Sequence, residues 1–111
     1  MSNELGDQRI FKVVLCRSIW DGRTQDESKN FATMTRDVQL PFPPSAGLQL
    51  CVAADMPRDI ARVRYDIEAE RFVCHFEDEF INVLDLDALE FDELIADGIE
   101  WGWKHVSTVS V

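Results

Sequence analysis

The residues from Asp59 to Glu77 read DIARVRYDIEAERFVCHFE and carry the clearest strand signal in the chain. On either side of the acidic stretch Ile67–Glu70, apolar and polar side chains alternate with the two-residue period of half-buried β-strands. This pattern predicts an antiparallel hairpin whose turn is the acidic stretch. Arg62 and Arg64 alternate with apolar residues, so we expect them on the polar face, beside carboxylates of the partner strand or the turn.

Three more strand-like segments precede the hairpin. The first two are joined by a polar loop, Ser18–Asn30, whose thirteen residues are long for a connection in a compact domain and favour a mobile or functional role. Proline residues in the connector 40–47 end the second segment. Consecutive strands without intervening helices favour antiparallel pairing. The segments are Ile10–Cys16, Phe31–Leu40 and Leu48–Ala54.

A helix is predicted over Ala88–Asp97, because apolar residues recur there with helical spacing. Asp87 resembles an N-cap, and Glu90 follows it at the spacing of a capping box. Gly98 is the residue expected just beyond the helix end. Like charges on the outer side of this helix oppose one another, so the helix must be stabilised by packing its apolar side.

The order of elements defines the fold class. Phe80–Leu86 is either a sixth strand or the lead-in to the helix, and Ile99–Val111 is a candidate last strand. We predict an α+β, mainly β fold, in which one C-terminal α-helix packs on an antiparallel sheet or small open barrel of five to six strands. The 111 residues fit a single domain, residues 1–111, with residues 1–8 as a frayed terminus.

Charge is distributed unevenly along the chain. Residues 77–100 hold ten carboxylates and no Lys or Arg, and the net charge of −10 arises wholly from residues 55–111. Apolar residues interleave with these acids, so a folded negative surface is more natural than a disordered acidic tail. The acidic face that we predict consists of Glu77, Asp78, Glu79, Asp85, Glu90, Glu93 and Asp97.

A surface of this sign indicates the kind of partner. It attracts a basic protein and repels nucleic acid and anionic lipid. Binding to a phosphate backbone needs clustered Lys and Arg, so we expect no nucleic-acid partner. No membrane partner is expected either, because no apolar run approaches the roughly 20 residues that cross a bilayer.

No catalytic signature stands out. Cys74 and His75 are adjacent, so on a strand they face opposite ways, and no spacing typical of a zinc site occurs. Standard phosphate-binding glycine motifs are absent as well. We therefore expect no metal, no cofactor and no catalytic residues. The odd number of cysteines, Cys16, Cys51 and Cys74, favours buried thiols in a reducing compartment, and hence a cytoplasmic location.

Three tryptophans are candidates for contact with a partner. Trp20 falls in the polar loop, which makes it the best candidate for an exposed aromatic side chain. Trp101 and Trp103 should point the same way on the last strand, either as a recognition platform or as part of the core. We favour the core, because a buried Trp contributes much of the area of a small core.

These observations favour a small acidic intracellular protein-interaction domain, non-catalytic, that docks a basic partner through its C-terminal acidic face. One alternative is a small-ligand-binding protein or enzyme with a site between the sheet and the helix, for which the polar loop would be the lid. Another is a structural module that self-associates into a homo-oligomer by pairing exposed strand edges. The simplest alternative is that the acidity only keeps the protein soluble.

Overall fold

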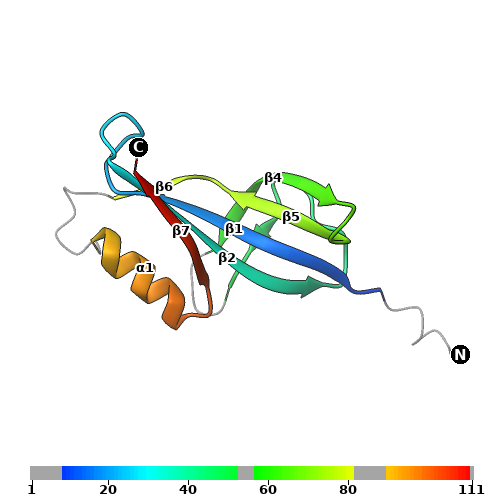
Figure 1. Cartoon of the computed structure of the whole chain (residues 1–111). Coiled ribbons are helices and arrows are strands. Elements are labelled where there is room, and N and C mark those ends of the chain that lie inside the picture. Colours follow the sequence, from blue (N-terminus) through cyan, green and yellow to red (C-terminus); the bar gives the residue numbers. More distant parts are fainter. Residues whose placement is uncertain (1–8, 53–56, 82–89, 111) are drawn as a thin grey trace, which may run out of the picture.

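The computed structural model describes residues 9–52, 57–81 and 90–110. The fold is α+β and mainly β, with one C-terminal helix packed on an open sheet, which confirms the predicted class (Figure 1). The sheet order is β3-β4-β5-β1-β2-β7, and β6 pairs with β1. The elements are β1 (Phe11–Trp20), β2 (Asn30–Leu40), β3 (Gln49–Leu50), β4 (Arg58–Asp66), β5 (Arg71–Phe76), β6 (Glu79–Phe80), α1 (Phe91–Glu100) and β7 (Lys104–Ser110).

The sheet is mixed, whereas the sequence predicted antiparallel pairing throughout. β1 pairs antiparallel with β2, β4 with β5, and β2 with β7. β1, however, runs parallel to β5 and then to β6. Because β2 occupies one edge of β1, the hairpin β4–β5 joins the other edge, and β6 continues along that edge once β5 has ended.

The first strand is longer than predicted. β1 continues past Cys16 to Trp20, so the loop between β1 and β2 comprises only residues 21–29. The ladder to β2 explains the extension, since Ser18 pairs with Thr33 and Trp20 with Phe31. The predicted third strand is reduced to Gln49–Leu50, and its last two residues, 53 and 54, lie outside the described residues.

The predicted hairpin is confirmed, but its polar face differs from the prediction. Arg62 lies opposite His75 and Arg64 opposite Val73, where carboxylates were expected. Both pairs belong to a regular ladder that starts at the turn with Asp66 opposite Arg71, and the register shift between Ile60 and Arg62 lies beyond them. The two guanidinium groups therefore face an imidazole and an apolar side chain.

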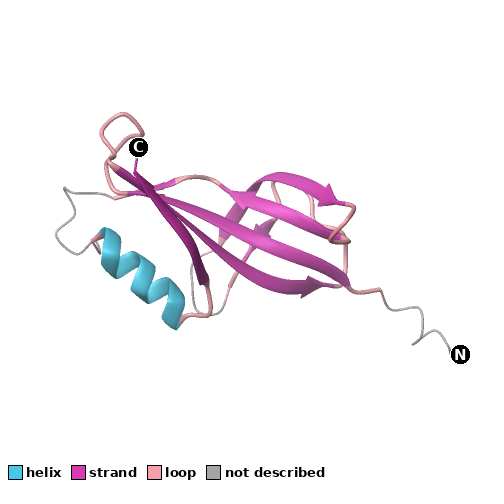
Figure 2. Cartoon of the chain, viewed as in Figure 1, coloured by secondary structure: helices cyan, strands magenta, loops and turns pink. Residues whose placement is uncertain are grey.

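The two faces of the sheet differ in how they are covered. One face carries Val13, Leu15 and Ile19 of β1, which are buried in the main core together with Ile95 of α1 and Trp103. Figure 2 shows α1 on this side of the sheet. The other face, called the open face below, has only a small buried cluster of Val14, Cys16 and Val73. No described helix lies over it.

The helix begins and ends later than predicted. Its N-cap is Glu90, and a capping box with Glu93 holds its first turn. The predicted N-cap, Asp87, lies outside the described residues. At the other end, the Gly102 N–H donates to the Ile99 carbonyl and the Trp103 N–H to the Gly98 carbonyl. With φ at +99° for Gly102, this is the Schellman ending that glycine favours.

Gly98 is therefore inside the helix, and its predicted role as the terminating residue is wrong. It is buried, and a Cβ at this position would approach the Met34 side chain to within 2.9 Å. Glycine here lets the helix backbone come close to the sheet, which outweighs its poor helix propensity. The terminating glycine is Gly102, four residues further on.

The three cysteines do not share one environment. Cys16 and Cys74 are buried, as predicted, whereas Cys51 is exposed just beyond β3. Burial raises the pKa of the Cys16 thiol, although Arg64 and Arg71 oppose the shift. Burial also raises the pKa of Cys74, to about 11, and the neighbouring Cys16 adds to this increase. The two buried thiols are thus protonated at neutral pH.

This contrast predicts the outcome of thiol labelling. In the native protein at neutral pH, a charged aromatic disulfide reagent should react quickly with Cys51 alone, because thiolate and access are both needed. After unfolding in denaturant, all three cysteines should react. A Cys51→Ser variant should show no fast native reaction. Rapid native labelling of that variant would contradict the described burial of Cys16 and Cys74.

Candidate functional site

The predicted acidic residues separate into groups on different parts of the structure. Glu90, Glu93 and Asp97 are exposed on α1 or at its start. Glu77 and Asp78 are exposed between β5 and β6, where Asp78 accepts a hydrogen bond from Gln25 of the 21–29 loop at 3.2 Å. Asp85 lies outside the described residues. Glu90, Glu93 and Asp97 are therefore the predicted acids that lie together, on the helix or at its start.

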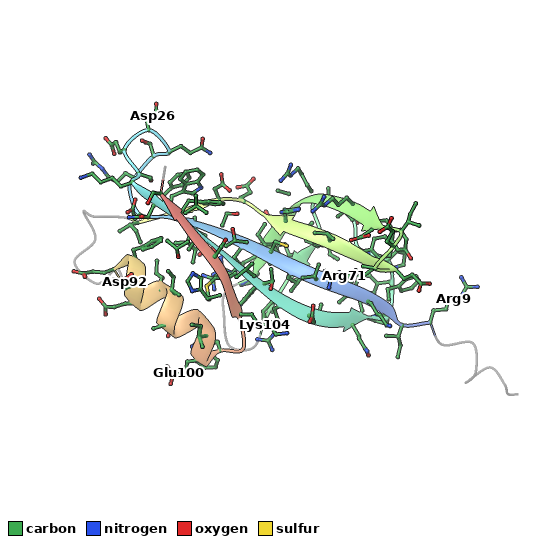
Figure 3. The ribbon with its side chains drawn as sticks, in the orientation of Figure 1. Arg9, Asp26, Arg71, Asp92, Glu100 and Lys104 are labelled. Atoms are coloured by element: carbon green, nitrogen blue, oxygen red, sulfur yellow. The ribbon has the colours of Figure 1, made fainter. Side chains whose placement is uncertain are left out.

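Two further acids complete the helix surface, and the predicted set omitted them. Asp92 and Glu100 are exposed, and Figure 3 shows both pointing away from the sheet at opposite ends of α1. The helical period could have identified them, because residues three and four apart share a face. No described cation lies within ion-pair distance of the four acids in α1, which are Asp92, Glu93, Asp97 and Glu100.

Glu79 is not part of this exposed surface, which corrects its predicted place on the acidic face. As part of β6 beside Ile19 of β1, it projects from the same face of the sheet as Arg17. Its two carboxylate oxygens accept hydrogen bonds from Arg17 Nε and Nη2, each at 2.8 Å. Arg58 approaches the same carboxylate at 3.0 Å. Glu79 is thus neutralised by cations at the seam between sheet and helix.

Arg17 is the residue that the sequence prediction missed. It sits within the apolar run of β1, beyond the predicted strand end, and its side chain is only 5% exposed. Its guanidinium carbon also lies 5.1 Å from the centre of the Trp103 ring, which is a cation–π contact. A charged residue between apolar neighbours on a strand was the available signal. A buried arginine needs such partners, since burying an unpaired charge is very costly.

A small cavity of about 190 Å3 lies at this seam. It is lined by Arg17, Arg58, Glu79, Leu94, Asp97, Gly98, Trp101 and Trp103. This is the place where the alternative of a site between sheet and helix would apply. Ligand pockets usually have about 300–1,000 Å3. The cavity is smaller than that range, so its volume does not favour a substrate or cofactor there.

The three tryptophans occupy different environments. Trp103 is 3% exposed and packs edge-on against Phe76, so its predicted place in the core is confirmed. Trp101 is 49% exposed, and the expectation that both rings point the same way is wrong. The reason is that Trp101 caps α1, whereas Trp103 follows the positive-φ turn at Gly102.

Trp20 is the third case. It ends β1 and is half-buried, so its predicted place in a polar loop is wrong. Its ring lies between Phe31, at 4.6 Å between ring centres, and Phe80, at 6.2 Å. The three rings form one aromatic cluster on the open face, and the β1–β2 register brings the first two together. Sequence reasoning did not foresee this cluster because it ended the strand too early.

The 21–29 loop is held by its own polar side chains, which opposes a role as a lid. The Asp21 carboxylate accepts hydrogen bonds from the Lys29 N–H at 2.7 Å and the Asn30 N–H at 3.0 Å. The bond from the Asn30 backbone is the main cause that lowers the pKa of Asp21. Inside the loop, Ser28 Oγ accepts from the Gly22 N–H at 2.9 Å.

The open face carries a group of basic side chains. Lys12, Arg62, Arg64 and Lys104 are exposed there, and Arg71 and His75 are half-buried. Burial lowers the pKa of His75, and the positive charges of Arg62 and Arg64 lower it further. α1 packs on the face that carries the main core, so the acidic helix and the basic groups of the open face lie on different sides of the sheet, although the chain as a whole carries a charge of −10.

Comparisons with known proteins add nothing to this picture. No protein-family model, no curated protein and no solved structure matches the chain. Across residues 9–52, 57–81 and 90–110, no three side chains of His, Cys, Asp or Glu are grouped as a metal site requires. The helix that the structure describes is too short and too polar to cross a membrane.

Proposed function

We propose that this protein is a non-catalytic interaction domain that docks a basic partner through the outer side of α1. The observation that carries the proposal is that the four helix acids are exposed and that none of them forms an ion pair with a described cation. Asp97 and Glu100 lie in the last turn of α1, which has no basic residue. Negative charge is unfavourable at that end of a helix, and an oppositely charged partner removes the cost.

Exposed apolar side chains at the C-terminal end of the helix support the same function. Ile99 is 52% exposed and Trp101 is 49% exposed, next to Glu100. A rigid aromatic anchor beside charged groups is typical of protein-binding surfaces. We therefore propose a partner segment that is basic along its length and has one apolar residue near this end. A cytoplasmic location is part of the proposal and agrees with the three free thiols.

The test uses a short Lys/Arg-rich peptide as a defined probe and, in parallel, capture of partners from a cell lysate. Glu93→Gln combined with Asp97→Gln should weaken peptide binding by about 3–10-fold, as expected for two charges at the edge of an interface. The affinity of the unchanged protein should fall steeply with salt. The matched control is Glu68→Gln with Glu70→Gln, two exposed acids in the β4–β5 turn.

The two double variants have the same net charge, so they separate a specific helix surface from general acidity. Equal weakening by both would show that acidity acts only through overall charge. Binding that is insensitive to salt would also exclude the proposal. Capture of the same lysate protein by the turn variant, but not by the helix variant, would support it.

Self-association is a second candidate, and the edge strand β7 favours it. All seven residues of β7 are exposed, and its pairing partner β2 covers only one edge. Val106 and Val109 are 60% and 50% exposed, and the strand has no ionisable side chain beyond Lys104 and His105. An edge with so few ionisable groups is suited to antiparallel pairing with a second copy. Sedimentation should then show dimers that Val106→Lys abolishes.

A further inference from the structure

Three nitrogen-bearing side chains meet on the open face, on the side of the sheet opposite α1. Arg62 of β4 lies directly across from His75 of β5. Arg64 projects from the same face of β4, two residues further along, so it is a diagonal neighbour of His75. These three residues and Val63 line an open hollow of about 520 Å3.

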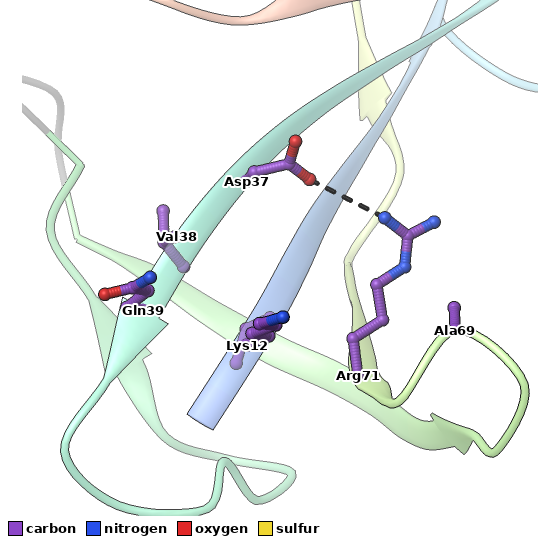
Figure 4. Close-up of a pocket in the computed structure, with 7 residues that line it drawn as sticks. Lys12, Asp37, Val38, Gln39, Ala69 and Arg71 are labelled. Carbon is purple, nitrogen blue, oxygen red and sulfur yellow. Dashed lines mark ion pairs between the residues drawn. The ribbon is translucent and has the colours of Figure 1, made fainter. Parts of the chain in front are cut away.

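The hollow is unusual because no described carboxylate is paired with its cations. The chain has twenty-one acids, yet none in the described residues lies within ion-pair distance of Arg62 or Arg64. The hollow in Figure 4 gives the comparison, because there Arg71 approaches Asp37 at 3.8 Å. Lys104 of β7 approaches the same carboxylate at 3.6 Å. The basic groups near Asp37 are thus partly neutralised, and those around His75 are not.

We propose that the hollow formed by Arg62, Arg64 and His75 binds the phosphomonoester dianion of a small soluble molecule. Each guanidinium presents a planar fork of N–H donors that matches phosphate oxygens, and a protonated imidazole adds another donor. A phosphoryl group has three terminal oxygens and about two negative charges, which corresponds to two arginines and one histidine. A carboxylate carries about one negative charge, so it would neutralise the three groups less completely than a phosphoryl dianion does.

The acids around the hollow favour a small phosphorylated molecule over a polyanion as its ligand. Asp66 ends β4, and Glu68 and Glu70 lie in the turn beyond it, all close along the chain to the arginines. Glu77 is exposed just past the end of β5 on the other side of His75. These acids, with a net charge of −10, repel an extended phosphate backbone or an anionic membrane.

Proton uptake by His75 should accompany binding. The charged groups that act on the His75 pKa are Arg62 and Arg64 on β4, and the β1 residue beside it is Cys16, whose raised pKa keeps the thiol neutral. Burial and the two arginines lower the pKa of His75. A bound dianion offsets the repulsion from the arginines and therefore raises that pKa. By linkage, the dianion binds more tightly when His75 is protonated, that is, at lower pH.

The experiment follows the ring resonances of both histidines by NMR during pH titrations in sodium chloride and in sodium sulfate of equal ionic strength. Sulfate replaces the phosphoryl group because it is tetrahedral and stays a dianion throughout. The His75 pKa should be higher in sulfate by about half to one unit, a modest value for an opposite charge at a partly exposed site. His105, which is exposed on β7, serves as the internal control and should not shift.

Variants test whether the arginines are the cause. Arg62→Gln with Arg64→Gln should raise the His75 pKa in chloride and abolish the sulfate effect. Arg23→Gln with Lys29→Gln, two exposed cations in the 21–29 loop, changes the net charge equally and should keep the effect. Equal sulfate shifts of His75 and His105, or a sulfate effect that survives the loss of Arg62 and Arg64, would overturn the proposal.

A last arm distinguishes the sources of phosphate. At a pH where it is a dianion, phenyl phosphate should move the His75 resonance to saturation. A thymidine oligonucleotide at the same phosphate concentration should move it less, because the acids around the hollow oppose a polyanion. Stronger binding of the oligonucleotide would overturn the proposal in favour of a nucleic-acid backbone. These measurements do not involve α1. Their failure therefore leaves the helix proposal standing, and failure of the helix proposal leaves the phosphate proposal standing.

Discussion

Replacing Trp103 by alanine is expected to lower the free energy of unfolding by about 3–5 kcal/mol, the usual cost of removing a large buried aromatic side chain. Trp103 is 3% exposed and contacts both Phe76 and the Arg17 guanidinium. Its loss removes core volume between the sheet and the helix and takes a cation–π partner from a buried arginine. Urea unfolding, followed by circular dichroism, measures the change.

Trp101 supplies the matched control two residues earlier. It is 49% exposed, so Trp101→Ala should change stability by less than about 1 kcal/mol. Trp103→Phe should fall between the two, because phenylalanine retains a ring over Arg17 and part of the buried area. Similar losses at positions 101 and 103 would mean that the described burial of Trp103 is wrong.

Glu79→Ala is expected to lower the free energy of unfolding by about 3 kcal/mol. This value is at the low end for breaking a buried ion pair, because the Glu79 side chain retains 21% exposure. The variant removes both hydrogen bonds that the carboxylate accepts from Arg17 and its ion pair with Arg58. The Arg17 charge remains buried and loses these contacts. Glu77→Ala, an exposed acid two residues away, should be close to neutral.

A double-mutant cycle shows whether Arg17 and Glu79 act together. Arg17→Met removes the buried charge and retains an apolar chain, so Glu79→Ala should cost much less in that background. The expected coupling is about 1–3 kcal/mol. Additive effects of the two changes would show that Arg17 and Glu79 have no interaction energy with each other. The stability of the double variant also indicates whether the pair is only structural, since replacing a structural ion pair by apolar residues often causes little loss of stability.

Several elements were predictable because their signals are local. The β4–β5 hairpin follows from strict alternation around an acidic turn, and its pairing is as predicted. Phe91, Leu94 and Ile95 share the inward face of α1, as the helical period implies. In both cases side-chain periodicity and the requirement to bury apolar surface act over a few residues.

The wrong predictions concern residues whose structure depends on contacts with segments far away in the sequence. Gly98 stands inside the helix because the helix backbone passes close to Met34 on β2, where a Cβ would come within 2.9 Å of the Met34 side chain. β1 extends to Trp20 because β2 and β6 pair with its end. Glu79 turns toward Arg17, sixty-two residues earlier in the chain, and so leaves the acidic surface. None of these contacts has a signal within a short stretch of sequence.

Composition and periodicity alone establish a mainly β domain with one C-terminal helix and an excess of acids in its second half, since these properties depend on neighbours in the chain. The assignment of charges to surfaces needed the folded chain. Pairing of β5 and β6 with β1 buries Glu79 against Arg17, leaves the helix acids in solvent, and places Arg62, Arg64 and His75 together on the uncovered side. The physical reason is that strand register, which is set by long-range backbone hydrogen bonds, decides which face each side chain occupies.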